Sequence, residues 1–180
     1  MNLQQHLNDF YVQHNIPENG GEDHKTFEVP LPFLKLILPN FSWRKKMLYI
    51  HDLEHILNHQ DTTWRGEIFI ASWEIATGFW KYFPICIFPL WTMGWGLWKH
   101  PSSVFSGFKK GSQDVGIAEL SISKERILQL SLAELQNLIL GKKQVSKYLK
   151  LRFLFFTFIS QIIFLAPIIV SALILFYFFS

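Results

Sequence analysis

The longest uncharged stretch of the chain restricts its fold more than any other feature. The run from Phe153 to Ser180 contains 28 residues and not one charged side chain. About 20 apolar residues in a helix are enough to cross the hydrocarbon core of a membrane. Pro167 lies near the middle of the run and should kink such a helix, which membrane helices tolerate. We therefore expect residues 153–180 to form a transmembrane anchor, with a hairpin of two short legs inside one leaflet as the alternative.

Basic side chains gather just before this run. They are Lys142, Lys143, Lys147, Lys150 and Arg152. Lys and Arg are enriched on the cytoplasmic side of membrane helices, so we expect a single C-terminal span with the preceding part of the chain in the cytoplasm. These residues do not form a stripe with interleaved aromatic side chains, so nucleic acid is not an expected partner.

The rest of the chain is also more apolar than an ordinary soluble domain. Hydrophobic residues make up 49% of the sequence and charged residues 17%, whereas a soluble domain carries about 25% charged residues. We expect an all-α protein in three parts: a polar N-terminal segment over 1–26, a helical domain over 27–150 and the transmembrane helix over 153–180.

Two apolar segments cannot be ordinary long helices because prolines interrupt them. Residues 27–39 contain Pro30, Pro32 and Pro39, which favours an extended or interfacial stretch. Residues 79–98 contain Lys81, Pro84 and Pro89 and so form a poor membrane span. For residues 79–98 we keep two alternatives. One is an interfacial or re-entrant segment that could line a lipid-accessible pocket, and the other is a buried core helix.

Helices are expected in several other places. Residues 2–14 can form a short surface helix. Ser42 is a candidate N-cap for a helix to about His59, and a second helix runs from about Trp64 to Gly78. Because few residues join these last two helices, they should pack as an antiparallel hairpin.

The segment after residue 100 also shows helix signals. Residues 102–117 should be helical, with Gly107 and Gly111 allowing close packing. Residues 123–140 should be helical as well, because Ser131-Leu-Ala-Glu134 is a capping-box pattern and Gly141 is a natural stop.

A stripe of ionisable side chains marks the first helix of the expected hairpin. At 100° per residue, His51, His55 and His59 fall within an arc of about 80°, and Asp52 widens it to about 100°. A core-facing stripe should not contain such residues. Histidines four residues apart let two imidazole nitrogens converge on one ion, so the spacing predicts a metal site.

Carboxylates early in the next helix can complete this set. If the turn is tight, Glu67 faces the stripe, and two imidazoles with one or two carboxylates then surround a divalent cation. Such a ligand set suits Zn²⁺, and it suits Fe²⁺ or Mn²⁺ equally. Of the three, Zn²⁺ is our preferred ion. Glu74 lies two turns beyond Glu67. It is either a carboxylate that orients an imidazole or an ordinary surface residue.

The same residues carry a resemblance to a known family. His51-Asp-Leu-Glu-His55, eleven residues and then Glu67 match the H-D-x-x-H-x(11)-E signature of the coenzyme Q biosynthesis protein 4 family, and the stretch Asp61–Glu67 resembles the family's turn and helix start. Weaker similarity continues through residues 107–111 and 132–135, so the resemblance covers roughly residues 28–141. His59, the Lys-Lys-Gly-Ser sequence around Gly111 and the C-terminal apolar run depart from the family pattern, which makes the chain a divergent member.

The resemblance implies a function in ubiquinone biosynthesis. It implies a helical, membrane-associated protein that takes part in replacing the C1 ring carboxyl of a polyprenylated precursor by a hydroxyl, or that organises the other biosynthetic enzymes. The implied metal ligands are His51, Asp52, His55 and Glu67. If the chain is an enzyme, whichever of Glu67 and Asp52 does not bind the metal is the candidate base.

Other functions remain open at this stage. A ring substrate or another lipid could enter from the membrane along residues 79–98 and reach the metal. Alternatively, the metal could only hold the helix hairpin together in a non-catalytic lipid-binding scaffold, or it could serve a metal-dependent lipid hydrolase. The sequence also leaves a homodimer open.

Overall fold

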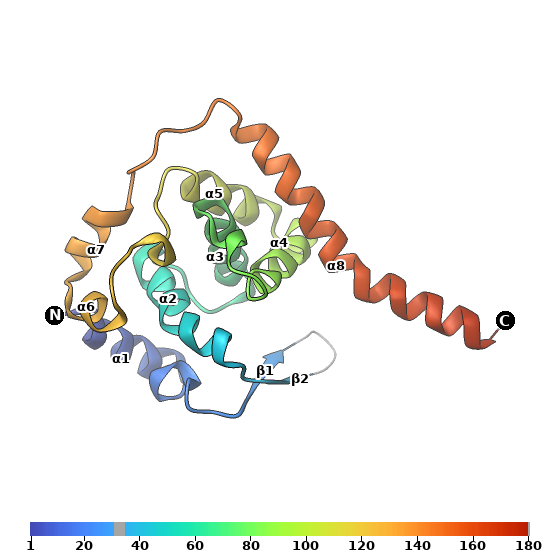
Figure 1. The fold of residues 1–180 in the computed structure, drawn as a ribbon, viewed down its shortest axis with the longest axis horizontal. Helices are drawn as coiled ribbons and strands as arrows, with labels where there is room; N and C mark the ends of the chain where they lie inside the picture. Colours follow the sequence, from blue (N-terminus) through green and yellow to red (C-terminus); the bar gives the residue numbers. More distant parts are fainter. Residues whose placement is uncertain (31–34, 180) are drawn as a thin grey trace. The chain divides into compact units, whose positions relative to one another are not determined.

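The fold was analysed in a computed structural model that describes residues 1–30 and 35–179 (Figure 1). It is mostly helical, as predicted. The chain divides into two compact units. The first contains residues 1–59 and 121–137, and the second contains residues 60–120 and 138–180. The three-part division predicted from composition stays a prediction.

The first unit is built around two helices. Helix α1 (Leu3–His14) begins with a capping box between Asn2 and Gln5 and packs against α2 (Ser42–Asn58). One face of α1 is buried through Leu3, Leu7, Phe10 and Tyr11, which is the spacing of an amphipathic helix. The predicted helix over 2–14 is confirmed, but it contributes to a core rather than lying wholly on the surface.

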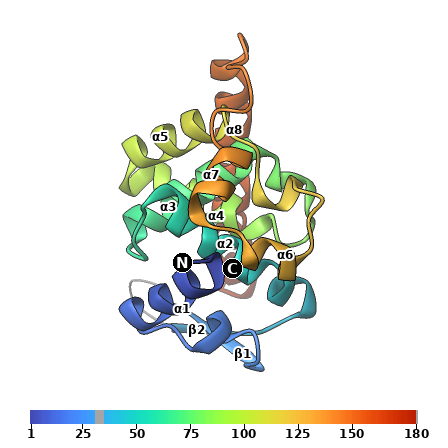
Figure 2. The same cartoon turned by 90° about the vertical axis from the view of Figure 1, so that its left-hand side faces the viewer.

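Short elements complete the first unit. The 3₁₀ helix η1 (Glu18–Gly21) follows α1 and contacts both α1 and α2, and α6 (Lys124–Gln129) packs on α1. The backbone N–H of Leu3 donates to the carbonyl of Leu130, which ties the start of α1 to the end of α6. Figure 2 shows α1 and α6 in this unit.

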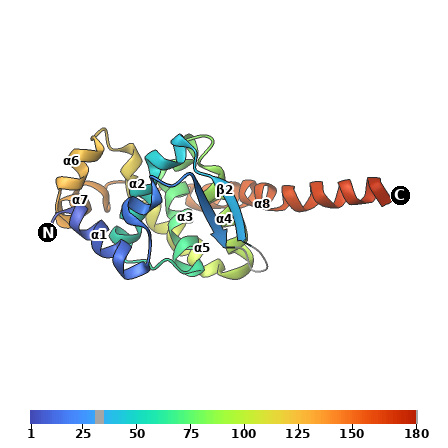
Figure 3. The same ribbon diagram turned by 90° about the horizontal axis from the view of Figure 1, so that it is seen from below.

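A small antiparallel hairpin departs from the all-α prediction. Strand β1 (Thr26–Pro30) pairs with β2 (Lys35–Pro39) in the register Phe27↔Leu38 (Figure 3). The extended conformation expected from the prolines is therefore confirmed for residues 27–30 and 35–39. Pro30 and Pro39 each end a strand, where a missing N–H is tolerated, whereas Pro32 lies outside the described residues.

Helix α2 differs from its prediction at both ends. Its N-cap is Phe41, so the predicted Ser42 cap is wrong by one residue. At the other end, His59 takes the left-handed conformation with φ 52° and terminates the helix. The placement of α2 against the next helix as an antiparallel hairpin stays a prediction.

The second unit is centred on α3 (Trp64–Thr77), which is buried along most of its length. It packs against α4 (Ile87–Lys99) and α5 (Pro101–Gly111). The predicted helix over 64–78 is confirmed, with Gly78 as its C-cap. The helix predicted over 102–117 ends at Gly111, and residues 117–119 form the separate 3₁₀ helix η3 (Ile117–Glu119).

Two glycines explain the close approach of α5 to α3. A side chain at Gly107 would overlap the carbonyl oxygen of Phe69, and one at Gly111 would overlap that of Trp73. The predicted role of both glycines in close packing is confirmed.

The helix predicted over 123–140 is broken into α6 and α7 (Leu132–Ile139). The break occurs because Ser131 starts a new helix. The carboxylate of Glu134 accepts from the Ser131 backbone N–H at 2.7 Å, and the Glu134 N–H donates to the Ser131 hydroxyl. Gly141 follows with φ 65°, so the predicted capping box and stop are both confirmed.

Helix α8 (Leu149–Phe179) ends the described chain. Its first half packs on α4, where the backbone of Ser160 lies directly against Gly94. Its second half runs away from α3, α4 and α5 (Figures 1 and 3). Among the described residues it is the one helix whose length and composition suit a membrane span, and its most apolar stretch is not buried.

Candidate metal centre

Helix α2 carries ionisable side chains into the interior of the first unit. Four polar residues on it are less than 9% exposed: Asp52, Glu54, His55 and Asn58. Charged side chains are rarely this buried unless they are paired or hold a metal. Of the stripe predicted from the sequence, Asp52 and His55 are buried, His51 is half-buried and His59 is exposed.

The two predicted histidine ligands lie edge to face, one turn apart on α2. The ring centroids of His51 and His55 are 4.9 Å apart, with the rings inclined by 72°. Phe10 of α1 covers His55, with 5.9 Å between ring centroids. His55 is 1% exposed, while His51 is half-buried. The pair thus presents one enclosed imidazole and one that solvent or a ligand can reach.

Two groups of potential metal ligands occur among the described residues, one on each helix. The first, on α2, consists of His51, Glu54 and His55, and the second, on α3, consists of Glu67 and Glu74. Histidines four residues apart on a helix can place two imidazole nitrogens on one ion. The α2 group can therefore supply two nitrogen ligands to a metal ion.

Each group contains a buried carboxylate, Glu54 on α2 and Glu74 on α3. Glu54 is 1% exposed and Glu74 3% exposed, so the surface alternative for Glu74 is wrong. Sequence reasoning missed Glu54. Its signal was present, because Glu54 lies three residues after His51 and therefore shares its helix face.

Asp52 is in neither group, and it has a hydrogen-bond partner within the first unit. The Tyr11 hydroxyl donates to Asp52 Oδ2 at 3.0 Å. Burial, and then the charge of Asp52, raise the pKa of Tyr11 well above its usual value, so the phenol stays protonated and remains a donor. A Cβ at Gly20 (φ +66°) would lie 2.8 Å from the same Oδ2. The metal-ligand and base roles of Asp52 stay predictions.

A half-buried cation lies near Asp52. Partial burial lowers the pKa of Arg44 to about 10, against the opposing effect of the Asp52 charge. Arg44 is therefore charged at neutral pH. Its guanidinium donates to Asn40 Oδ1 at 2.9 Å and lies 3.6 Å from the centre of the Phe27 ring.

His59 does not continue the histidine stripe. Its left-handed backbone ends α2, and its side chain is exposed. The periodicity argument assumed that the helix continues through residue 59. Because the helix stops at Asn58, His59 is outside both ligand groups.

Within the second unit, a buried hydrogen bond fixes the rotation of the helix that carries Glu67 and Glu74. The indole N–H of Trp73 donates to Asp114 Oδ2 at 2.9 Å, and Asp114 Oδ1 accepts from the Gly141 N–H at 2.9 Å. Asp114 is 3% exposed. These bonds hold α3 in one orientation, and the two carboxylates share a face of it because they are seven residues apart.

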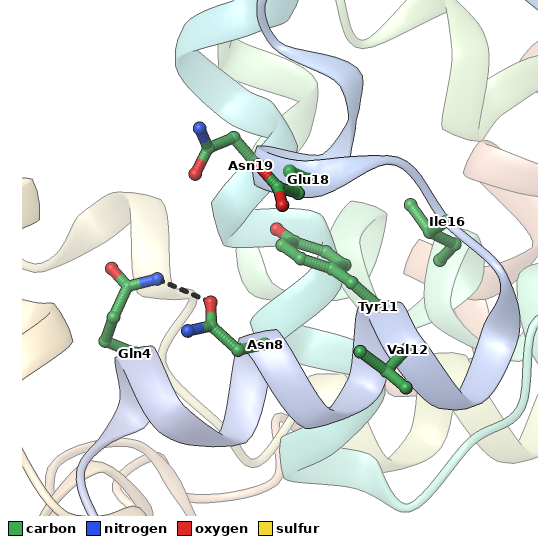
Figure 4. A pocket seen from close by; sticks show the side chains of 7 residues that line it. All are labelled: Gln4, Asn8, Tyr11, Val12, Ile16, Glu18 and Asn19. Atoms are coloured by element: carbon green, nitrogen blue, oxygen red, sulfur yellow. Dashed lines mark hydrogen bonds between the residues drawn. The ribbon is translucent and has the colours of Figure 1, made fainter.

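The first unit also contains a pocket of about 560 Å³ that borders the centre only through Tyr11. It is lined by Gln4, Asn8, Tyr11, Val12, Ile16, Glu18 and Asn19 (Figure 4). The Gln4 amide donates to Asn8 across its floor at 3.0 Å. None of the residues in the two ligand groups lines it, so we do not assign it as the entrance to the metal centre.

Comparison with models of known families, with curated proteins and with solved structures found no match. Imidazole is a borderline ligand and carboxylate a hard one, and together they suit zinc and other divalent first-row metals.

Proposed function

We propose that this chain is a membrane-anchored metalloprotein in which His51, His55 and Glu67 hold a divalent ion. The observation that carries the proposal is the pair His51 and His55, which lie one turn apart on α2 with 4.9 Å between their ring centroids. Glu67 is the third ligand that the H-D-x-x-H-x(11)-E pattern supplies. Zn²⁺ is the preferred ion because it takes mixed nitrogen and oxygen ligands. Fe²⁺ and Mn²⁺ are the alternatives. The apolar helix α8 is the proposed anchor, with the metal centre on the cytoplasmic side.

Three protein ligands leave a coordination position open, which is typical of catalytic sites. A bound divalent ion supplies Lewis-acid polarisation of a carboxylate or carbonyl oxygen. His51 and Glu67 are half-buried rather than enclosed, so a substrate group can approach from their side. Asp52, oriented by the protonated Tyr11 hydroxyl, is the residue proposed to hold or accept a proton.

The substrate we propose is a lipid with a polar ring, and specifically a polyprenylated ubiquinone precursor. Two features support this class: the H-D-x-x-H-x(11)-E pattern, and an exposed apolar helix that keeps the chain at a membrane. The proposed role is in replacing the C1 carboxyl of the ring by a hydroxyl, or in organising the enzymes that modify the ring. In the first case the carboxyl leaves as CO₂, the hydroxyl oxygen comes from O₂, and a two-electron reductant converts the second oxygen atom to water. This reaction would require Fe²⁺ or Mn²⁺, because Zn²⁺ has no redox chemistry.

A structural metal is the second candidate. His55, Glu54 and Glu74 are almost fully buried, and closed sites are typical of metals that support folding. In this case the chain would be a non-catalytic lipid-binding scaffold, and its loss of metal would lower stability without a change in chemistry.

The proposal is tested by metal analysis of the full chain purified in detergent. We expect about one divalent ion per chain in the wild type and in the control His59→Asn, because Asn tolerates the left-handed conformation at that position. We expect loss of metal in His55→Ala. Metal-free wild-type protein from cells supplied with zinc, iron and manganese would contradict the proposal.

The role of the metal is tested in cells that lack this chain, by mass spectrometry of their lipids. Accumulation of a carboxylated polyprenyl phenol that is cleared by the wild type but not by His55→Ala supports the enzymatic function. If His51→Ala loses thermal stability but still restores the quinone profile, the metal is structural. An unchanged quinone profile on deletion would contradict the quinone substrate.

A further inference from the structure

We infer that α4 is immersed in the cytoplasmic leaflet beside α8, so that its aromatic face contacts lipid acyl chains. This inference rests on the proposed anchor and extends it to a second element of the same unit. The argument uses only contacts within that unit, and it begins with the position along α8 at which α4 is bound.

The contacts between α4 and α8 fall in the first half of α8. Trp91 and Trp95 pack on Phe164 with ring centroids 5.6 and 5.9 Å apart. The Trp98 indole N–H donates to Gln161 Oε1 at 2.9 Å. The Gln161 side chain donates in turn to the carbonyl of Gly94 at 2.8 Å. Helix α4 is therefore attached through residues 160–164 of α8.

These contact positions lie within the hydrocarbon region of one leaflet if the membrane span begins after the last basic residue. Arg152 is the last cation before the apolar run, and α8 rises about 1.5 Å per residue. A hydrocarbon core that starts at Phe153 places residues 160–164 about 10–17 Å inside it. One leaflet of that core is about 15 Å thick, so a helix packed on these residues cannot stay in water.

The side chains of α4 and of the segment before it suit that environment. Residues 82–98 contain no charged side chain, and Lys81 and Lys99 stand at the two ends. Large apolar side chains in this region remain exposed, namely Trp80 at 45%, Phe83 at 80%, Ile87 at 42% and Trp98 at 69%. Trp is enriched at the level of the lipid headgroups. Several large apolar side chains exposed within one short segment are unusual on a soluble surface.

The first half of α8 shows the same exposure. Leu154, Phe155 and Phe158 are 62%, 56% and 66% exposed beside the α4 contact. If the membrane began only after Gln161, these three side chains would stand in water. The close approach at Gly94, where the Ser160 backbone allows no side chain, is also the small-residue packing that membrane helices use. Lipid is therefore the occupant that fits both helices.

Spin-label accessibility in vesicles tests the inference. The full chain carrying Cys86→Ala is labelled at single cysteines introduced as Phe83→Cys, Ile87→Cys and Trp98→Cys, and it is reconstituted in phosphatidylcholine and phosphatidylglycerol. Leu173→Cys is the reference for lipid, and Val12→Cys, an 81% exposed position on α1, is the reference for water. Collisions with O₂, which concentrates in lipid, are compared with those of an aqueous nickel chelate. All five positions are exposed, so folding should survive each change.

We expect the O₂-to-nickel ratio at residues 83, 87 and 98 to match that at 173 and to exceed that at 12 several-fold. Ratios like that at residue 12, with 173 in lipid, would overturn the inference and restrict the span to residues 162–179. Low accessibility to both reagents would overturn it too, because a second protein copy would then cover the face. If residue 173 itself reports water, the proposed anchor fails, whereas the metal content is unaffected by any of these outcomes.

Discussion

In most soluble proteins apolar side chains are buried and charged ones are exposed, and helices α2 and α8 depart from this pattern in opposite ways. Helix α2 hides polar groups, with Glu54 and His55 each 1% exposed, while α8 shows apolar ones, with Leu173 at 63% and Phe176 at 72%. A buried carboxylate is unfavourable without a compensating charge, and an exposed apolar stripe is unfavourable in water. Each inversion agrees with the proposed partner of the helix, which is a divalent ion for α2 and a lipid phase for α8.

The largest effect is expected when charged side chains are introduced into α8. We expect the double variant Ile169→Lys and Leu173→Lys to leave the membrane fraction, because each Lys at the centre of a span costs about 3 kcal/mol. Alkaline extraction of membranes measures this. The control Val12→Lys changes an exposed apolar residue of α1 and should stay with the membrane. Retention of the double variant would show that α8 does not span.

The next largest effect concerns α2 itself. We expect His55→Ala to weaken zinc binding at least a hundredfold, about 3 kcal/mol, because loss of even an outer partner of a ligand costs about 10–100-fold. Competition with a chromogenic chelator gives the affinity. His59→Asn, at the exposed end of the same helix, should bind like the wild type. Equal affinities in all three proteins would contradict the ligand assignment.

A smaller effect should locate the point at which α8 changes from packed to exposed. We expect Gly94→Ala to destabilise the protein by about 1–3 kcal/mol, because a Cβ there overlaps the Ser160 carbonyl. The control Ala166→Val adds more volume in the exposed part of α8 and should change stability little. Thermal unfolding in detergent measures both. A neutral Gly94→Ala would mean that α4 and α8 are not in close contact.

The smallest effect tests how α2 holds its buried carboxylate. We expect Tyr11→Phe to lower stability by about 1–2 kcal/mol, because Asp52 loses its hydroxyl donor. Tyr148→Phe is the control, since Tyr148 is 56% exposed. Chemical unfolding of the two variants under the same conditions gives the difference. If both behave alike, Asp52 does not depend on Tyr11.

Local patterns in the sequence predicted most of the helices. The capping box of Ser131 and Glu134, the stop at Gly141 and the close-packing glycines on α5 all depend on neighbours within one or two turns. A few neighbouring residues in the sequence are enough to recognise such signals. The β-hairpin was predicted only as an extended stretch, because its pairing depends on a turn that the prolines did not specify.

The candidate site was only partly predictable for the same reason. The spacing of His51 and His55 can be recognised within one predicted helix. The hydrogen bond from Tyr11 to Asp52, in contrast, joins residues 41 positions apart in the sequence. Glu54 was missed because the motif treats its position as variable. His59 was included wrongly in the stripe, because nothing in its periodicity showed that it would adopt the left-handed conformation.

The central claim is that His51, His55 and Glu67 bind one divalent ion, and X-ray absorption spectroscopy of the zinc-loaded full chain tests it most directly. We predict nitrogen and oxygen neighbours at about 2.0–2.1 Å with the outer-shell scattering of two imidazoles. In each of the variants His51→Ala and His55→Ala, the scattering from one imidazole should be lost. A zinc shell without imidazole scattering, or one unchanged in both variants, would contradict the claim.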